Sequence, residues 1–269
     1  MTQFDTESST RRDADGHWSG HVSGAWSIGE NPNGGYLTSL ALSAVLDAVP
    51  HPDPISLTTH FLRPGIAEAP CRVRVEVIRS GRTLSTVRAT LLQEDKPRIE
   101  VLAALSDLDR PAGVDTELTL PAPALPAPEV CVPRSGAMQN LHLPILERLS
   151  VLLHPDLAVP GSADRAEMSG WIGFADGRAP DARALALFTD AFPPSPLSLL
   201  GVIGWVPTLE LTVHVRRRPA PGWIRARFVT DDLHEGRMIE TGALWDSNGA
   251  LVAQSRQIGL VTASGGDRS

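Results

Sequence analysis

The sequence predicts an α+β protein of two similar halves, each an antiparallel sheet wrapped around a central helix. Three observations indicate this fold class: a proline-rich stretch divides the chain, a residue pattern recurs on both sides of it, and a helical segment precedes strand-like segments in each half. With 269 residues, 42% of them apolar, the chain is large enough to bury one big core or two moderate ones.

The dividing stretch contains six prolines from Pro111 to Pro133 and has neither helical nor strand periodicity. A long floppy insert is unusual in a compact protein, so we expect this linker to be ordered against the surface. The predicted organisation is a flexible N-terminal arm (1–15), an N-terminal half (16–110), the linker (111–135), a C-terminal half (136–263) and a flexible tail (264–269).

The recurring pattern begins with Leu57-Thr58-Thr59-His60, which is repeated as Leu211-Thr212-Val213-His214. Gly81-Arg82 follows the first copy and Gly236-Arg237 follows the second at nearly the same distance. Matched order and spacing indicate an internal duplication.

Each half has a predicted helix ahead of its strands. Apolar residues recur at helical spacing from Leu37 to Ala48, behind Gly34-Gly35. Residues 182–192 are the expected counterpart, ended by Pro193-Pro194. Alternating or apolar runs then predict four strands in each half, at 55–62, 72–79, 83–93 and 98–105 and at 208–217, 223–230, 238–246 and 250–261.

Composition excludes several classes of protein. The net charge of -7 argues against a nucleic-acid binder, and no apolar run is long enough for a membrane span. The start of the chain lacks the pattern of a leader, and Cys71 and Cys131 do not form a disulfide or zinc pattern, so we expect a cytoplasmic protein. The motifs of serine α/β-hydrolases, zinc proteases and nucleotide-binding loops are absent from the sequence, and we expect neither a metal nor a cofactor.

Four segments carry a resemblance to a known family: NGGYLTSLAL, THFLRPG, SGRTLSTVRATLLQEDKPRIEVLAAL and LVAQSRQIGLV. They are similar to the acyl-CoA thioesterase II family, whose members are double hotdogs. The resemblance implies hydrolysis of acyl-CoA by a water molecule that an Asp, a Thr and a Gln of the second hotdog hold. The matching positions are Asp190, Thr208 and Gln257.

The residues themselves leave alternatives open. Asp190 lies in an apolar helix, where a carboxylate is costly unless it is hydrogen-bonded, but it is also compatible with a solvent-facing helix end. Strand alternation puts Thr208 on the face opposite to Leu211, which is equally typical of an exposed strand residue. Gln254 and Gln257 point to opposite faces of one strand, so only one of them can serve.

For the substrate, we expect contacts with Gly34, Gly35, Tyr36 and Arg216. A glycine-led helix start presents N–H groups to an anion or carbonyl, and Arg216 in a basic run suits the phosphates of coenzyme A. A tight helix entry and a solvated strand end explain these residues equally well. We expect a homo-oligomer, because wrapped sheets leave edges to cover.

Two other functions compete with hydrolysis. A non-catalytic acyl-CoA or acyl-carrier binding protein is the main alternative, favoured by the proline-broken segment after Asp190. A hotdog hydratase is the weaker one, because Gly29 and Gly34 stand where its acid and base would be.

Overall fold

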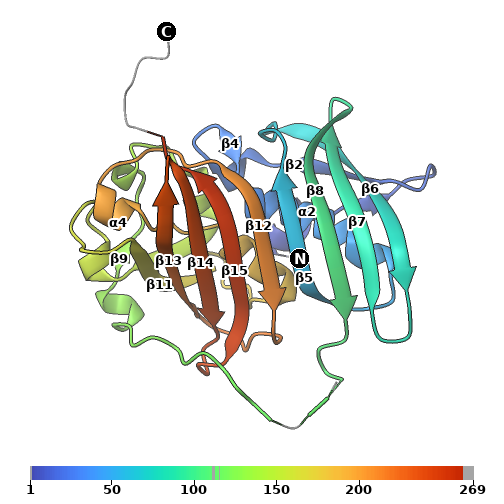
Figure 1. Ribbon diagram of the computed structural model, residues 1–269. Coiled ribbons are helices and arrows are strands. Elements are labelled where there is room, and N and C mark those ends of the chain that lie inside the picture. Colours follow the sequence, from blue (N-terminus) through green and yellow to red (C-terminus); the bar gives the residue numbers. More distant parts are fainter. Residues whose placement is uncertain (1, 111–112, 115, 263–269) are drawn as a thin grey trace.

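The computed structural model describes residues 2–110, 113–114 and 116–262, and its main feature is one antiparallel sheet of thirteen strands (Figure 1). The strands of the N-terminal half are β1 (Arg11–Arg12), β2 (Trp18–Val22), β5 (Asp53–Phe61), β6 (Ala69–Ser80), β7 (Ser85–Gln93) and β8 (Lys96–Ser106). Those of the C-terminal half are β9 (Val132–Pro133), β10 (Leu149–Leu153), β11 (Glu167–Phe174), β12 (Thr208–Val215), β13 (Ile224–His234), β14 (Arg237–Trp245) and β15 (Leu251–Leu260).

The sheet order is β1, β2, β6, β7, β8, β5, β12, β15, β14, β13, β11, β10, β9. Outside this sheet, β3 (Ser27–Ile28) pairs with β4 (Asn31–Pro32). The α-helices are α1 (Gln3–Glu7), α2 (Gly34–Ala48), α3 (Ala182–Phe188) and α4 (Leu197–Leu200), with short 3-10 helices at Gly24–Trp26, Pro128–Val130, Gly136–Met138, Pro144–Glu147 and Pro155–Leu157. No helix in these described ranges is long and apolar enough to cross a membrane.

The two halves share one sheet because β5 pairs with β12 at its centre (Figure 1). The expectation of two separate sheets is therefore wrong. Each half-sheet ends in a strand with unpaired N–H and C=O groups, and joining them satisfies both edges. The register pairs Leu57 with Val213 and Thr58 with Thr212, whose hydroxyl groups are 3.0 Å apart.

The duplication is visible in this register. Outward from the centre, β5-β8-β7-β6 is matched by β12-β15-β14-β13. If Leu57 corresponds to Leu211, then Thr58 corresponds to Thr212, and these two threonines pair with each other. An approximate two-fold axis therefore passes between them. All eight strands expected from the sequence are present, with ends shifted by a few residues.

The two central helices differ in length. In α2, apolar residues from Leu37 to Val45 are buried against the sheet. The second helix was expected over 182–192, but α3 ends at Phe188, and the Thr189 hydroxyl donates to the Ala186 carbonyl. Asp190 and Ala191 have hydrogen-bond partners outside α3, so the chain leaves the helix well before Pro193.

The N-terminal residues are held in place, contrary to the loose arm expected from their polar composition. Phe4 of α1 is fully buried, with ring centroids 5.7 Å from Trp26 and 5.0 Å from Phe174. One aromatic side chain thus anchors a polar segment to the core, across both halves.

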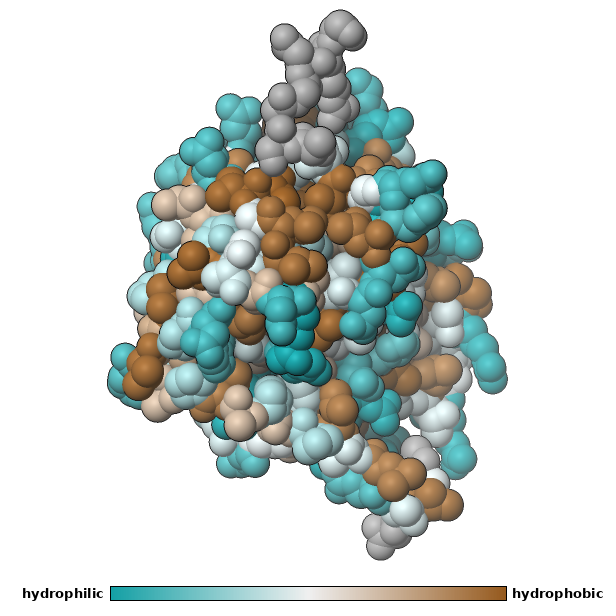
Figure 2. Space-filling model, turned by 60° about the vertical axis from the view of Figure 1, so that its left-hand side comes forward, coloured by the Kyte–Doolittle hydropathy of each residue, from teal (hydrophilic) through white to brown (hydrophobic). Residues whose placement is uncertain are grey.

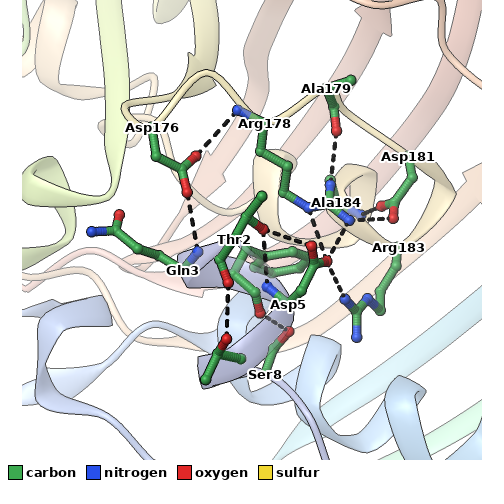
Figure 3. Close-up of polar contacts among 12 residues, drawn as sticks. Thr2, Gln3, Asp5, Ser8, Asp176, Arg178, Ala179, Asp181, Arg183 and Ala184 are labelled. Atoms are coloured by element: carbon green, nitrogen blue, oxygen red, sulfur yellow. Dashed lines mark hydrogen bonds and ion pairs between the residues drawn. The ribbon is translucent and has the colours of Figure 1, made fainter.

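A polar cluster surrounds this anchor (Figure 3). Asp5 accepts hydrogen bonds from the guanidinium groups of Arg178 and Arg183, and these cations hold its pKa down at about 2 against the effect of burial. Arg178 also donates to Asp181, which caps the N-terminus of α3. The cluster therefore ties α1 to the start of the helix that leads to Asp190.

The described part of the linker makes hydrogen bonds to the second half. The indole N–H of Trp245 donates to the Leu120 carbonyl and that of Trp171 to the Pro126 carbonyl. Its last residues form β9, which pairs with β10. The tail expected at 264–269 lies outside the described residues.

Candidate active site

A cavity of about 210 Å³ lies where the two halves meet at the N-terminus of α2. Most of its wall is apolar and comes from both halves, including Leu37, Phe61, Phe192, Phe228 and Met238. The polar residues on its wall are Asn31, Asn33, Arg63, Arg134, Gln139, Thr189, Asp190, Thr208, Glu240 and Gln257. An apolar chamber with a few converging polar groups is typical of a small-molecule site.

Three exposed apolar residues, Leu62, Trp205 and Leu209, line this cavity and form its rim. The segment from α4 to β12 also exposes Leu199 and Val202. Figure 2 shows hydrophobic residues gathered on the face of the molecule that carries α4 in Figure 1. The surface beside the cavity therefore suits an apolar ligand.

Asp190 follows α3 and reaches across to the first half. Its Oδ2 accepts hydrogen bonds from the Gly35 N–H at 2.8 Å and from the Asn33 side-chain amide at 2.9 Å. The same amide donates to the Asp190 carbonyl at 2.8 Å, while Asn33 Oδ1 caps α2 at the Tyr36 N–H. A carboxylate at a helix N-terminus gains from the free N–H groups and the helix dipole.

Gly34 and Gly35 make this approach sterically feasible. A Cβ atom at Gly35 would lie 2.8 Å from the Ala186 carbonyl oxygen, and one at Gly34 would lie 2.6 Å from the Phe61 ring. No side chain fits at such distances. Gly35 is therefore required by the close packing of α2 against α3 and Gly34 by the Phe61 ring of β5, and the pair leaves the backbone N–H groups accessible.

The electrostatic setting makes Asp190 a stronger base than an ordinary aspartate. Burial raises its pKa to about 6, the charge of Glu240 adds to the rise, and the Gly35 N–H, Arg134 and Asn33 oppose it. Burial lowers the pKa of Arg134 to about 10, and Asp190 opposes that fall. A carboxyl group with this pKa changes protonation near neutral pH, as a general base requires.

Arg134 supports the segment after Asp190. It is 4% exposed, and its guanidinium group donates to the Ala191 carbonyl at 2.5 Å and to Gln139 Oε1 at 2.8 Å. No carboxylate lies within ion-pair distance of it in the described part of the chain. It therefore gives the cavity wall a positive charge close to Asp190.

Thr208 and Gln257 form a hydrogen-bonded pair on the opposite wall. The Thr208 hydroxyl donates to Gln257 Oε1 at 3.0 Å, and Gln257 Nε2 donates to Glu240 Oε1 at 2.5 Å. Strict alternation would put Thr208 on the outer face with Thr212. A register shift between Thr208 and Glu210 breaks the alternation and turns Thr208 into the cavity.

The structure also places the other residues expected at the site. Gln254 is exposed, whereas Gln257 is 7% exposed and lines the cavity. Tyr36 lies outside the cavity: its hydroxyl donates to the Glu7 carbonyl at 2.6 Å, and its ring stacks on Trp26. Arg216 is exposed just after β12, at the opposite end of that strand from Thr208.

The first half has apolar residues where the second half has its polar set. Pairing across the half-sheets makes Pro54 the equivalent of Thr208 and Ala103 the equivalent of Gln257. Val87, which pairs with Ala103, takes the place of Glu240, which pairs with Gln257. The duplicated fold therefore contains one such polar set.

Sequence reasoning missed Asn33, Arg134 and Glu240. Asn33 has a local signal, since an asparagine before a helix start is a typical N-cap, but its link to Asp190 has none. Arg134 lies at the end of the linker, and Glu240 lies in an alternating strand where one glutamate is unremarkable. Within the described residues, no group of three or more His, Cys, Asp or Glu could hold a metal ion.

The arrangement provides what hydrolysis of an ester-like bond needs. Oδ1 of Asp190 has no partner among the described residues and is available to accept a proton. The Gly34 N–H also has no partner there, at the first turn of α2, and Gly34 lines the cavity. A base, a hydroxyl group and a free N–H donor thus converge on one apolar chamber.

Comparison with known proteins agrees with this geometry. Residues 22–106 match the acyl-CoA thioesterase N-terminal domain, and residues 123–261 match the acyl-CoA thioesterase C-terminal domain. A candidate thioesterase II from Thermobifida fusca YX has a similar structure, with a TM-score of 0.88 and 30% identity over 98% of both chains.

Two mycobacterial proteins are more distant. Acyl-CoA thioesterase II TesB2 of Mycobacterium marinum has a TM-score of 0.75 at 21% identity, over 98% of this chain and 100% of that one, a likeness of fold. An uncharacterised protein of Mycobacterium tuberculosis is 26% identical over 273 residues, which is 91% of this chain and 90% of the relative.

We predict that Gly35→Ala disturbs the site through α3. The new methyl group meets the Ala186 carbonyl oxygen at 2.8 Å, so α3 and Asp190 must shift, at a cost of about 1–3 kcal/mol in unfolding free energy. Chemical denaturation measures this loss. Gly81→Ala is the matched control, because its Cβ comes no closer than 3.6 Å to another residue. Equal stability of the two variants would contradict the steric role of Gly35.

Proposed function

Since the chain belongs to the acyl-CoA thioesterase II-like family of double hotdog proteins, we propose that it hydrolyses acyl-CoA to the free acid and coenzyme A. One observation carries this proposal: the carboxylate of Asp190, from the second half, lies against the N-terminus of α2 of the first half, in the cavity that also holds Thr208 and Gln257. No covalent intermediate is needed.

Asp190 and Thr208 hold the attacking water in this mechanism. The Thr208 hydroxyl donates its hydrogen bond to Gln257, so its oxygen is free to accept a hydrogen bond from water. The water donates one hydrogen bond to the Thr208 oxygen and the other to Asp190 Oδ1. These two bonds turn a lone pair of the water oxygen toward the thioester carbon. Asp190 takes the water proton as the carbon–oxygen bond forms, and returns it to the sulfur as the carbon–sulfur bond breaks.

The Gly34 N–H stabilises the carbonyl oxygen as negative charge develops on it. This N–H is free at the start of a fifteen-residue helix, whose dipole favours negative charge. It is also next to the N–H that holds Asp190, so donor and base are placed by the same helix turn. A hydrogen bond from the Gly34 N–H to the thioester carbonyl oxygen therefore holds the carbonyl carbon near the attacking water.

The remaining cavity accommodates the substrate. Its apolar wall suits the acyl chain, and the rim opens to solvent at Leu62 and Trp205. Arg63 is exposed beside Leu62 and lines the cavity, with no carboxylate partner in the described ranges. We assign it the role that the sequence suggested for Arg216, a cation that meets the phosphates of coenzyme A.

Asp190→Asn is expected to lower kcat for thiol release from acyl-CoA by roughly 10²- to 10⁴-fold, because the amide cannot accept the water proton. The measurement is coenzyme A release from short, medium and long acyl chains. The raised pKa means that the ionised carboxylate destabilises the fold at neutral pH, so the variant stays folded. Tight acyl-CoA binding without thiol release by the wild-type protein would favour the non-catalytic binding protein instead.

Hydrolysis should depend on pH through Asp190. Its pKa is about 6, and the protonated form cannot act as base, so kcat/KM falls as the pH drops through about 6. A pH profile of thiol release in buffers of constant ionic strength measures this acid limb. A profile that stays flat down to about pH 4, the ordinary value for aspartate, would contradict the assignment.

Arg63→Gln should raise KM roughly three- to tenfold and leave kcat unchanged, because one exposed cation facing a phosphate contributes about 1 kcal/mol. Arg216→Gln is the control, since Arg216 is exposed at the far end of β12 and lies outside the cavity wall. Steady-state kinetics at low and high salt separate the two. A larger rise in KM for Arg216→Gln than for Arg63→Gln would indicate that Arg216, and not Arg63, meets the phosphates.

A further inference from the structure

Glu240 is a buried carboxyl group whose partners are all uncharged. It lies in β14, is 4% exposed and lines the cavity, and it has no ion pair within the described ranges. Its Oε1 accepts from Gln257 Nε2 at 2.5 Å, and its Oε2 accepts from the Ser195 N–H at 2.7 Å. A buried carboxylate without a cation is costly, so its presence calls for a role.

The role follows from hydrogen-bond direction. An ionised carboxylate only accepts, so Glu240 fixes the NH₂ side of the Gln257 amide toward itself and leaves Oε1 for Thr208. The Thr208 hydroxyl must then donate to Gln257, and its oxygen faces the cavity as an acceptor. A hydrogen-bond donor at position 240 would allow the Gln257 amide group to rotate by about 180°. The directions of the hydrogen bonds from Gln257 to residue 240 and from Thr208 to Gln257 would then reverse.

The duplication supports a joint role for these residues. In the first half, Pro54, Val87 and Ala103 stand at the positions of Thr208, Glu240 and Gln257. The first half therefore lacks all three polar residues together. Its Val87 and Ala103 are buried. Packing at these strand positions therefore does not require a carboxyl group.

We propose that Glu240 is a positioning residue, which fixes the direction of the Glu240–Gln257–Thr208 hydrogen bonds and thereby the orientation of the attacking water. The proposal rests on the hydrolytic function proposed above. In this role Glu240 acts on the water through Gln257 and Thr208. Its charge has a second, measurable consequence at Asp190.

Three other charged groups line the cavity with Asp190: Glu240 from β14, Arg134 after β9 and Arg63 after β5. Glu240 raises the pKa of Asp190 and Arg134 lowers it. Removing the charge of Glu240 takes away one cause of the rise and leaves Arg134 to act against the effect of burial, so the pKa of Asp190 is expected to fall. The acid limb of the pH profile would then move to lower pH.

Glu240→Gln tests the proposal, since it keeps the shape but can donate as well as accept. We expect kcat to fall about tenfold to a hundredfold with KM within about twofold of the wild-type value, and the acid limb to move to lower pH. Glu167→Gln is the control: Glu167 is 5% exposed and pairs with Arg227, away from the cavity wall. It should alter stability without moving kcat or the limb.

Glu240→Asp separates hydrogen bonding from charge and serves if Glu240→Gln does not fold. It should lower kcat, because the shorter carboxylate loses Gln257, but leave the acid limb in place. An unchanged kcat in both variants would overturn the proposal while wild-type thiol release still supports hydrolysis.

A ¹³C NMR titration of the Asp190 carboxyl gives a readout that needs no turnover. A lower pKa in Glu240→Gln supports the coupling even if the wild-type protein releases no thiol, which would refute the hydrolytic function alone. An unchanged pKa would overturn the coupling.

Discussion

Hydrogen bonds between β5 and β12 hold the two halves in one register, and the position of every group in the cavity depends on that register. The pairing puts α2 beside α3, because α2 packs on the first half-sheet and α3 lies over the shared centre, against both β5 and β12. Only then can Asp190 of one half reach the helix start of the other. A shift by two residues would move Asp190 by about 7 Å and separate the base from Gly35.

The close contact between the halves that forms the cavity also buries two carboxyl groups, which costs folding free energy. Asp190 and Glu240 are two carboxyl groups in one apolar chamber, and burial raises the pKa of each. Backbone N–H groups, Asn33 and the buried Arg134 offset part of this cost. An aspartate that titrates near neutral pH is the chemical benefit, and the two glycines that admit it to the helix start are the steric condition.

Duplication followed by divergence explains why one cavity suffices. The first half has the long helix α2, whose N-terminal N–H groups can bind negatively charged oxygens. It has apolar residues at the strand positions equivalent to Thr208 and Gln257. The second half has a short α3, which ends early and frees Asp190, and it carries the polar strand residues. Each half thus supplies what the other lacks. The N-terminal helix α1 strengthens the join, because Phe4 contacts Trp26 of the first half and Phe174 of the second, and Asp5 pairs with Arg178 of the second.

The amino-acid sequence alone predicts the duplication, the helix-then-strands order and the strand positions, because these depend on local periodicity and on repeated motifs. It also singled out Asp190, Thr208 and Gln257, which the structure brings to one cavity. Long-range packing is needed to explain why the halves form one sheet, why α3 stops early, and why a register shift turns Thr208 inward. The contacts of Asn33, Arg134 and Glu240 join positions far apart in the chain or on neighbouring strands, and local patterns do not encode which strands will meet.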